Sequence, residues 1–305
     1  MDHLSALIRD LRAAFPGLDL RENEPLSKHS SFRIGGPAAL LLAPASAGEL
    51  AGLCRFLRAR GADPFLLGNG TNLLFPDAGL DKVVVQTCPG VGRIERRDES
   101  LTAEAGATLA QLASVAQSAG LAGLEFAHGI PGSVGGGVVM NAGAYGGELK
   151  DVVAETEYLD GVSLERRVLQ GGEHEFSYRH SVFSDRPGVV LRTTVRLVPG
   201  DPAAIAARMR ELADKRRASQ PLDMPSAGST FKRPTGGFAA ALIDEAGLKG
   251  TAVGGAMVSP KHAGFVVNTG GATADDVLRL IEHIQSVVFE RTGILLEPEV
   301  RLVRE

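Results

Sequence analysis

Cysteine and tryptophan are scarce in this sequence. Its 305 residues include two cysteines, Cys54 and Cys88, and no tryptophan. Two thiols in so long a chain exclude a disulfide framework and a cysteine-based zinc site, and we expect no metal site. Cys54 falls in an apolar helical stretch and Cys88 follows a strand-like run, so we expect both to be small buried residues.

The sequence also lacks an excess of one charge and a long apolar run. Its formal net charge is -4, so no positive field attracts nucleic acid. Its apolar content of 44% and charged content of 22% are close to those of average soluble proteins, which excludes a disordered or fibrous chain. No run approaches the roughly 20 apolar residues that span a bilayer. Residues 1–15 carry scattered charges, unlike a signal peptide, so we expect a cytoplasmic protein.

Apolar periodicity and end signals predict a mixture of helices and strands. Helical spacing predicts helices over residues 3–15, 46–61, 108–118, 201–217, 238–246 and 273–293. Three capping boxes are predicted: Ser46 with Glu49, Thr108 with Gln111, and Thr273 with Asp276. Short apolar runs predict strands over residues 65–67, 83–85, 158–160, 167–169, 189–197 and 294–303. The elements do not alternate strictly, which favours an α+β fold of several domains with boundaries near 82, 199–201 and 293.

Glycine is abundant, at 38 of 305 residues, and it is clustered. Clustered glycine indicates tight turns or backbone that lies close to a ligand. The clusters fall in residues 31–37, 67–73, 129–146 and 225–232. These segments are therefore the first candidates for a binding site.

The segment at residues 67–73, Leu-Gly-Asn-Gly-Thr-Asn-Leu, follows a predicted strand. Its small residues expose successive backbone N–H groups, which suits an anion such as a pyrophosphate. It is not a Rossmann fingerprint, because Leu73 stands in place of the third glycine and no helix is expected to follow. A glycine-rich turn without a ligand is an equally good interpretation of this segment alone.

The segment at residues 129–146 is dense in glycine and has no charged residue. A solvent-exposed loop would carry more charge, so we expect this backbone to pack against a large flat ligand. A buried turn between domains is the alternative. In the fourth cluster Ser229 lies between Gly228 and Thr230, which taken alone is ordinary turn chemistry. No G-x-S-x-G elbow, P-loop or zinc motif is present.

Taken together and in order, these segments resemble one family. They read HSSFRIGGPA, LGNGTNLL, GIPGSVGGGVVMNAGAYGGE, YRHSVF, PSAGSTFK, LIDEAGLKG and LLEPEV, and they run from about Leu26 to Val303. This series is similar to that of the UDP-N-acetylenolpyruvoylglucosamine reductases. The first two motifs alone would indicate only the wider vanillyl-alcohol-oxidase-like FAD fold.

The resemblance implies a three-domain α+β protein of the vanillyl-alcohol-oxidase-like (PCMH-type) FAD-binding fold. Residues 1–82 would form FAD-binding subdomain 1, joined by a C-terminal strand at 294–305. Residues 83–199 would form FAD-binding subdomain 2, and residues 200–293 an α+β substrate-binding domain. FAD is expected to be non-covalent, because Pro37 follows Gly-Gly where some relatives of the fold carry histidine.

The resemblance also implies a reaction. NADPH is the hydride donor, FAD carries the hydride, and the enolpyruvyl ether of UDP-N-acetylglucosamine is reduced to UDP-N-acetylmuramate for peptidoglycan synthesis. Three residues match the family's catalytic positions. Ser229 would donate the proton, and Arg179 would bind the substrate carboxylate and hold the enolate charge. Glu299 would assist protonation or fix the enol form. Without the resemblance, Arg179 and Glu299 could be solvated charges on strands.

Further binding residues follow from the same motifs. The resemblance implies that FAD is held by glycine-rich loops with exposed backbone N–H groups. These loops comprise Arg33, Gly35, Gly36, Gly68, Asn69, Gly70, Thr71, Asn72, Gly129, Ile130, Pro131, Gly132, Ser133, Gly135, Gly136, Asn141, Gly143 and Ala144. The residues that would hold substrate are Arg179, Arg217, Gln220, Lys232 and Arg233. Arg233 stands where the family often has asparagine, and Lys232 could assist Ser229. His128 is expected to be a buried, satisfied histidine.

Two features bear on subclass and on rival functions. The chain runs directly from YRHSVF into the next strand, so it resembles the subclass that lacks a tyrosine-bearing insertion. The rivals are another flavin oxidoreductase of this fold that acts on a sugar or alcohol, and a non-catalytic flavin or nucleotide-sugar binding module. We expect a monomer.

Overall fold

The computed structural model describes residues 3–304, which form two compact units. Each unit is assembled from three separate stretches of chain, so segments distant in sequence meet within it. Unit 1 contains residues 3–22, 40–69 and 82–213. Unit 2 contains residues 23–39, 70–81 and 214–304.

The largest sheet of unit 1 is antiparallel and five-stranded, and it contains the predicted meander. Its order is β12 (Arg166–Gln170), β11 (Val153–Asp160), β13 (Gly188–Arg196), β7 (Ser100–Glu104) and β6 (Ile94–Arg97). The strands predicted over 158–160 and 167–169 are confirmed and extend further than expected, and the one predicted over 189–197 is confirmed with a shift of one residue. Along β13, Leu191, Thr193 and Val195 are buried and alternate with more exposed residues, so the expected period of two is also confirmed.

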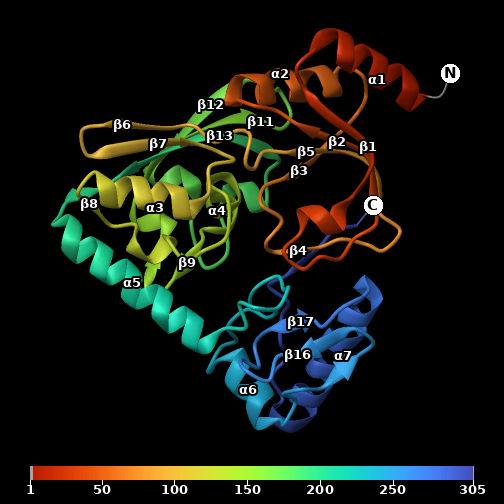
Figure 1. The fold of residues 1–305 in the computed structure, drawn as a ribbon, viewed down its shortest axis with the longest axis vertical. Helices are drawn as coiled ribbons and strands as arrows, with labels where there is room; N and C mark the ends of the chain where they lie inside the picture. The colour runs from red at the N-terminus through yellow and green to blue at the C-terminus, as the bar shows by residue number, and fades with distance from the viewer. Residues whose placement is uncertain (1–2, 305) are drawn as a thin grey trace. The chain divides into compact units, whose positions relative to one another are not determined.

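Helices α3 (Leu109–Ser118) and α4 (Val134–Met140) cover one face of this sheet (Figure 1). The predicted capping box of α3 is present: Thr108 and Gln111 satisfy each other's backbone N–H groups. Leu109 and Leu112 then turn into the core against Leu101 and Val195. The cap and the apolar spacing were sufficient to predict this helix.

Helix α4 was not predicted, because the glycines of residues 129–146 read as a loop. It begins at Ser133, whose hydroxyl accepts the N–H of Gly136. A Cβ on Gly135 would lie 3.0 Å from the Cβ of Ala105, and one on Gly137 would lie 2.9 Å from Leu149. Close packing thus requires glycine on this helix, and burial outweighs the low helix propensity of glycine.

A four-stranded sheet has the order β1 (Asp19–Pro25), β2 (Pro37–Ala43), β5 (Leu80–Gln86) and β3 (Phe65–Leu67). Helices α1 (His3–Ala14) and α2 (Ala47–Arg58) pack within unit 1 against its apolar residues. The box predicted for α2 is half right. The Ser46 hydroxyl accepts the Glu49 N–H, but the Glu49 carboxylate accepts the N–H of Ala45 rather than that of Ser46. Cys54 and Cys88 are buried, as predicted.

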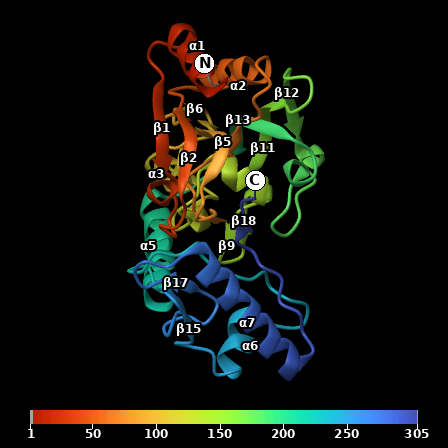
Figure 2. The same ribbon diagram turned by 90° about the vertical axis from the view of Figure 1, so that its right-hand side faces the viewer.

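Unit 2 contains a small antiparallel sheet with two helices beside it (Figure 2). Its strands are β15 (Ala252–Val253), β16 (Ala256–Val258) and β17 (Val266–Asn268), and its helices are α6 (Ala239–Glu245) and α7 (Ala274–Thr292). The predicted box of Thr273 with Asp276 begins α7, and Gly293 ends it in the left-handed region at φ 71°.

The C-terminal strand predicted over residues 294–303 is wrong in length. Only β18 (Arg301–Leu302) is regular, and it pairs in parallel with β4 (Leu73–Leu74). Leu296 and Val300 are buried in the core of unit 2, which accounts for the apolar pattern. Pro298 lies in this segment and has no N–H to donate, so a continuous ladder cannot form there.

The remaining elements are short, apart from α5 (Pro202–Ser219), which begins where Asp201 accepts the N–H groups of Ala203 and Ala204. Strand β8 (Leu121–Ala122) pairs with β14 (Val198–Pro199), and β9 (Gly143–Ala144) pairs with β10 (Gly147–Glu148). Single turns of 3-10 helix lie at Leu26–His29, Glu125–Ala127, Leu149–Asp151, Gly171–His174 and Val182–Ser184. No helix among residues 3–304 combines the length and the apolarity that crossing a bilayer requires.

Candidate active site

In unit 2 the backbone that follows the predicted proton donor, Ser229, pairs with the segment that carries the predicted carboxylate, Glu299. Phe231 bridges Pro298 in antiparallel fashion, and the N–H of Glu299 donates to the Thr230 carbonyl at 2.8 Å. The N–H of Lys232 donates to the Glu297 carbonyl at 2.8 Å. Ser229 and Glu299 therefore lie on adjoining backbone although 70 residues separate them in sequence. The Ser229 side chain is exposed, and Glu299 is half-buried.

Thr230 lies at the centre of this pairing and is 5% exposed. Its hydroxyl oxygen accepts the N–H of Val266 at 2.9 Å, and its own N–H donates to the Gly264 carbonyl at 2.8 Å. With the Glu299 bond, three chain segments meet at one residue. A buried network whose groups are all paired is stiff. Ser229, as the next residue, is held by this backbone.

Lys232 and Glu297 form an ion pair beside this backbone. The ammonium group of Lys232 is thus directed to Glu297, and its suggested assistance to Ser229 stays a prediction. Glu297 is exposed whereas Glu299 is half-buried, so the two carboxylates of the LEPEV motif have different surroundings.

Two other predicted segments join the same assembly in unit 2. The Ser31 hydroxyl donates to the Ser226 carbonyl at 2.7 Å, and the Ser31 N–H donates to the Gly70 carbonyl at 3.1 Å. The Asn72 side-chain amide donates to the Glu299 carbonyl at 3.1 Å. The SFRIGG, GNGTN, PSAGST and LEPEV motifs therefore meet through hydrogen bonds that involve backbone atoms.

The other residues predicted to hold substrate differ in their surroundings. Arg217 is exposed and pairs with Asp214, and Arg233 lies over the Phe238 ring, 4.0 Å from its centroid. The side-chain oxygen of Gln220 is buried and accepts no hydrogen bond from residues 3–304. A buried acceptor without a donor is costly, so this oxygen is suited to a ligand's N–H or O–H.

In unit 1, Gly68 and the Asn69 side chain contact the glycine-rich segment. The Asn69 side-chain amide donates to the Pro131 carbonyl at 2.5 Å, and the Cys88 thiol donates to its oxygen at 3.4 Å. A Cβ on Gly68 would overlap the Ser133 hydroxyl. Two segments that were predicted separately to bind the cofactor are thus in contact.

Several glycines of the loops predicted to hold FAD are required by close packing within the protein, because a Cβ would not fit there. A Cβ on Gly35 would lie 2.7 Å from that of Phe75, and one on Gly143 would lie 2.7 Å from the Glu148 side chain. A Cβ on Gly70 would overlap the His29 carbonyl. Glycine density alone is therefore not a sign of a ligand, and the sequence interpretation relied on it too heavily.

The polar groups that remain do fit a flavin dinucleotide. The backbone N–H groups of Asn69, Gly70 and Thr71 make no hydrogen bond within the described part of the chain. Successive free N–H groups on a glycine loop suit the oxygens of a pyrophosphate. No carboxylate lies between Gly129 and Gly147 to repel them.

Arg179 lies in unit 1 on a two-residue turn. Ser177 and His180 bridge each other through N–H···O bonds of 3.1 and 3.3 Å, which leaves Tyr178 and Arg179 at the tip. Arg179 has φ 56°, in the left-handed region that non-glycine residues rarely adopt. Arg33 has φ 57° and is exposed. Such strain persists only where the surroundings hold it, and it is common at functional sites.

Two further features lie outside the predicted set. His128 was expected to be buried, but it is half-buried.

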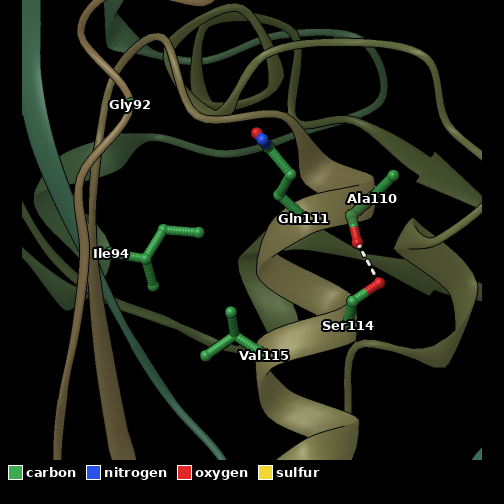
Figure 3. Close-up of a pocket in the computed structure, with 6 residues that line it drawn as sticks. All are labelled: Gly92, Ile94, Ala110, Gln111, Ser114 and Val115. Atoms are coloured by element: carbon green, nitrogen blue, oxygen red, sulfur yellow. Dashed lines mark hydrogen bonds between the residues drawn. The ribbon is translucent and has the colours of Figure 1, made fainter.

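A groove of about 450 Å³ lies between β6 and α3 in unit 1 (Figure 3). The Ser114 hydroxyl in it donates to the Ala110 carbonyl at 2.8 Å, and Gln111 is used in the helix cap. The polar groups of the groove are satisfied within the helix and do not converge on a ligand. None of the residues predicted to bind cofactor or substrate lines it. Its lining consists of Gly92, Ile94, Ala110, Gln111, Ser114 and Val115.

Comparison with known proteins agrees with these motifs. Residues 38–163 match the FAD binding domain family, and residues 220–303 match the family described as UDP-N-acetylenolpyruvoylglucosamine reductase, C-terminal domain. A reductase of that name from Caldanaerobacter subterraneus subsp. tengcongensis is 49% identical over 93% of both chains. One from Levilactobacillus brevis is 45% identical over 98% of both chains.

A solved structure is similar as well. The crystal structure of UDP-N-acetylenolpyruvylglucosamine reductase (MurB) from Thermus caldophilus superposes with a TM-score of 0.79 at 36% identity. The match covers 94% of this chain and 99% of that one. The likeness thus extends over the whole architecture and is not confined to a shared cofactor domain.

Fold and motifs together define an FAD-dependent oxidoreductase with a C-terminal α+β domain. Within that class, the chain belongs to the UDP-N-acetylenolpyruvoylglucosamine reductase family. The fold class, the FAD cofactor and the family resemblance expected from the sequence are confirmed.

Proposed function

We propose that this protein reduces the enolpyruvyl ether of UDP-N-acetyl-3-O-(1-carboxyvinyl)-glucosamine to UDP-N-acetylmuramate, with NADPH as the hydride donor, in peptidoglycan precursor synthesis. Bound FAD supplies hydride transfer from NADPH to the vinyl group. The observation that carries the proposal is the backbone hydrogen bond from Glu299 to Thr230, the neighbour of Ser229, in a chain of this family. It places the segments that carry the hydroxyl and the carboxyl side by side, and a protonation step needs such groups.

The roles of the reacting residues follow from their chemistry. Ser229 protonates the carbon next to the substrate carboxylate, and Glu299 assists that proton transfer. Arg179 binds the carboxylate and stabilises the charge that develops on it, because a guanidinium is always charged and can donate two parallel hydrogen bonds. Lys232, Arg217 and Arg233 are proposed to meet the diphosphate, and Gln220 to accept a hydrogen bond through its unsatisfied oxygen.

Binding of FAD is assigned to the loops that the motifs define. We propose that the free N–H groups of residues 69–71 meet the pyrophosphate and that residues 33–36, 129–136 and 143–144 line the rest of the cofactor. We also propose a functional division into residues 1–82 with 294–305, residues 83–199, and residues 200–293. The match of residues 220–303 to a C-terminal domain family supports the last of these.

The setting is proposed from the chemistry of the reactants. NADPH and a uridine diphosphate sugar are intracellular metabolites, so we place the enzyme in the cytoplasm. We propose that it acts as a monomer, because every proposed role is assigned to a residue of the one chain.

Anaerobic turnover tests the proposed reaction. Purified holoprotein should oxidise NADPH beyond the amount that reduces its own flavin only when the enolpyruvyl sugar nucleotide is added. Mass spectrometry should then find a product heavier by two hydrogens. Turnover of an alcohol or sugar that depends on oxygen would favour the oxidase alternative. Bound FAD without turnover of either kind would favour a binding module.

A further inference from the structure

Asn141 was predicted to bind the cofactor, but its side chain is fully engaged inside unit 1. It is 1% exposed and ends α4 in the left-handed region, at φ 43°. Its amide nitrogen donates to the Glu148 carboxylate at 2.8 Å and to the Ser177 carbonyl at 3.0 Å. Its oxygen accepts the Lys150 N–H at 3.0 Å. A carboxamide has two N–H donors, and both are used within the protein, so neither is left for a flavin.

The bond to Ser177 places Asn141 at the base of the turn that carries Arg179. The Ser177 carbonyl accepts both this bond and the His180 N–H that closes the turn. A second hydrogen bond joins the same two segments, because the buried Ser181 hydroxyl donates to the Val139 carbonyl at 2.9 Å. The last turn of α4 and the YRHS segment are thus joined at two points.

Glu148 links Asn141 electrostatically to the guanidinium group of Arg179. Its carboxylate binds the Lys150 ammonium at 2.8 Å as well as Asn141. The pKa of the Glu148 carboxyl lies below its ordinary value, chiefly because Lys150 donates a hydrogen bond to it. The hydrogen bond from Asn141 and the nearby charges of Lys150 and Arg179 lower it further. Arg179 is therefore within electrostatic reach of the cluster that Asn141 organises.

We infer that Asn141 is a positioning residue for Arg179, acting through Ser177 and Glu148, and not a ligand of the cofactor. This inference rests on the proposed function. It explains both why asparagine ends α4 and why its carboxamide is bound within the protein. Asparagine tolerates the left-handed conformation that ends α4, and its carboxamide can join three backbone or side-chain partners there. A long arginine on a strained two-residue turn needs such an anchor, since a misplacement of about 1 Å can cost about 100-fold in rate.

Asn141→Gly is the most informative variant, because glycine adopts the left-handed conformation freely and only the carboxamide is lost. The expected results are a faster amide exchange of the 177–181 peptide and a fall of about 10-fold or more in the rate at which substrate reoxidises the reduced flavin. Flavin reduction by NADPH and FAD affinity, titrated by fluorescence on the apoprotein, should stay within about 2-fold of wild type.

Asp98→Gly is the matched control, because Asp98 is also left-handed, at φ 52°, and lies exposed between β6 and β7. It should leave all these measurements unchanged. The double variant Asn141→Gly/Arg179→Lys should be no slower than Arg179→Lys alone by more than about 2-fold, since residues that act as one unit are not additive.

Three results would overturn the inference: weaker FAD binding with an unchanged reoxidation rate, unchanged exchange of the 177–181 peptide, or additive losses in the double variant. Should Asn141→Gly not fold, Glu148→Gln carries the same test with the same pattern expected at smaller size. If exchange rises while Arg179→Lys leaves reoxidation unchanged, the proposed role of Arg179 fails and the positioning of its turn by Asn141 stands.

Discussion

The two regions that carry the proposed reacting residues are held in different ways. In unit 2, Ser229 and Glu299 lie on adjoining backbone, around the buried Thr230. In unit 1, Arg179 lies on a short turn, and hydrogen bonds of the Asn141 and Ser181 side chains connect this turn to α4. A region held by backbone bonds should tolerate most side-chain changes that leave the backbone unstrained. A region held by a few side chains should be sensitive at those side chains.

The largest effect expected in the backbone-held region comes from Gly70→Ala. Gly70 has φ 61°, and a Cβ there would overlap the His29 carbonyl, which cannot yield as a flexible side chain could. We expect a loss of about 3 kcal/mol in the free energy of unfolding, measured by urea denaturation of the apoprotein. Gly146→Ala is the control: it has φ 88° but open space around it, so about 1–2 kcal/mol is expected. Equal losses would show that the close contact at Gly70 is not what holds this region.

Ser229→Ala should have the next largest effect, on chemistry rather than stability. The reoxidation of reduced flavin by substrate should slow about 100-fold or more, because a general acid is lost. Its reduction by NADPH should stay close to the wild-type rate, since no proton from Ser229 is needed there. Anaerobic single-turnover absorbance separates the two steps. A similar loss in both would mean that Ser229 supports the whole fold or the cofactor.

Thr230→Val tests whether the backbone pairing depends on one hydroxyl. Valine has nearly the same shape but leaves the buried N–H of Val266 without an acceptor, which should cost about 1–3 kcal/mol in unfolding free energy. Thr230→Ser keeps the acceptor and should recover most of that loss. If valine and serine were equivalent, the remaining backbone bonds of Thr230 would be sufficient to hold Ser229.

The smallest expected effect is a pH dependence of the free energy of unfolding, and it comes from Cys54 in unit 1. Burial raises the pKa of the Cys54 thiol to about 12, above its ordinary value. The folded state therefore keeps this proton at pH values where the unfolded state has lost it. Stability from this group is full below the unfolded pKa of about 8.5 and falls above it, by up to about 1.4 kcal/mol per pH unit. Urea denaturation of wild type and Cys54→Ala between neutral pH and pH 10 should show a steeper decline for wild type, and parallel curves would contradict this.

Much of the fold could be predicted because its signals are local. Capping pairs such as Thr108 with Gln111 determine where a helix begins, and alternation along residues 189–197 determines which side of a strand is buried. The motifs that carry the active site were found because they are contiguous in sequence. The meeting of Ser31 with Ser226, or of Asn72 with Glu299, is not local, and no pattern in one sequence reveals it.

The errors have a common physical origin in tertiary packing. Helix α4 was missed because its glycines are poor helix formers, and only contact with Ala105 and Leu149 explains them. The C-terminal strand was overextended because the apolar pattern of Leu296 and Val300 reflects burial and not a ladder. The prediction that Asn141 binds the cofactor rests on its place in a glycine-rich motif, whereas the hydrogen bonds that favour a positioning role could be known only from the fold.

In the proposed function, this chain passes a hydride from NADPH, by way of its bound FAD, to an enolpyruvyl sugar nucleotide. Anaerobic stopped-flow absorbance of the holoprotein follows this transfer through the colour of the flavin. NADPH should bleach the flavin, and the enolpyruvyl substrate should then restore its colour without oxygen. Flavin that stays bleached after the substrate is added, and recovers only in air, would rule out this hydride transfer.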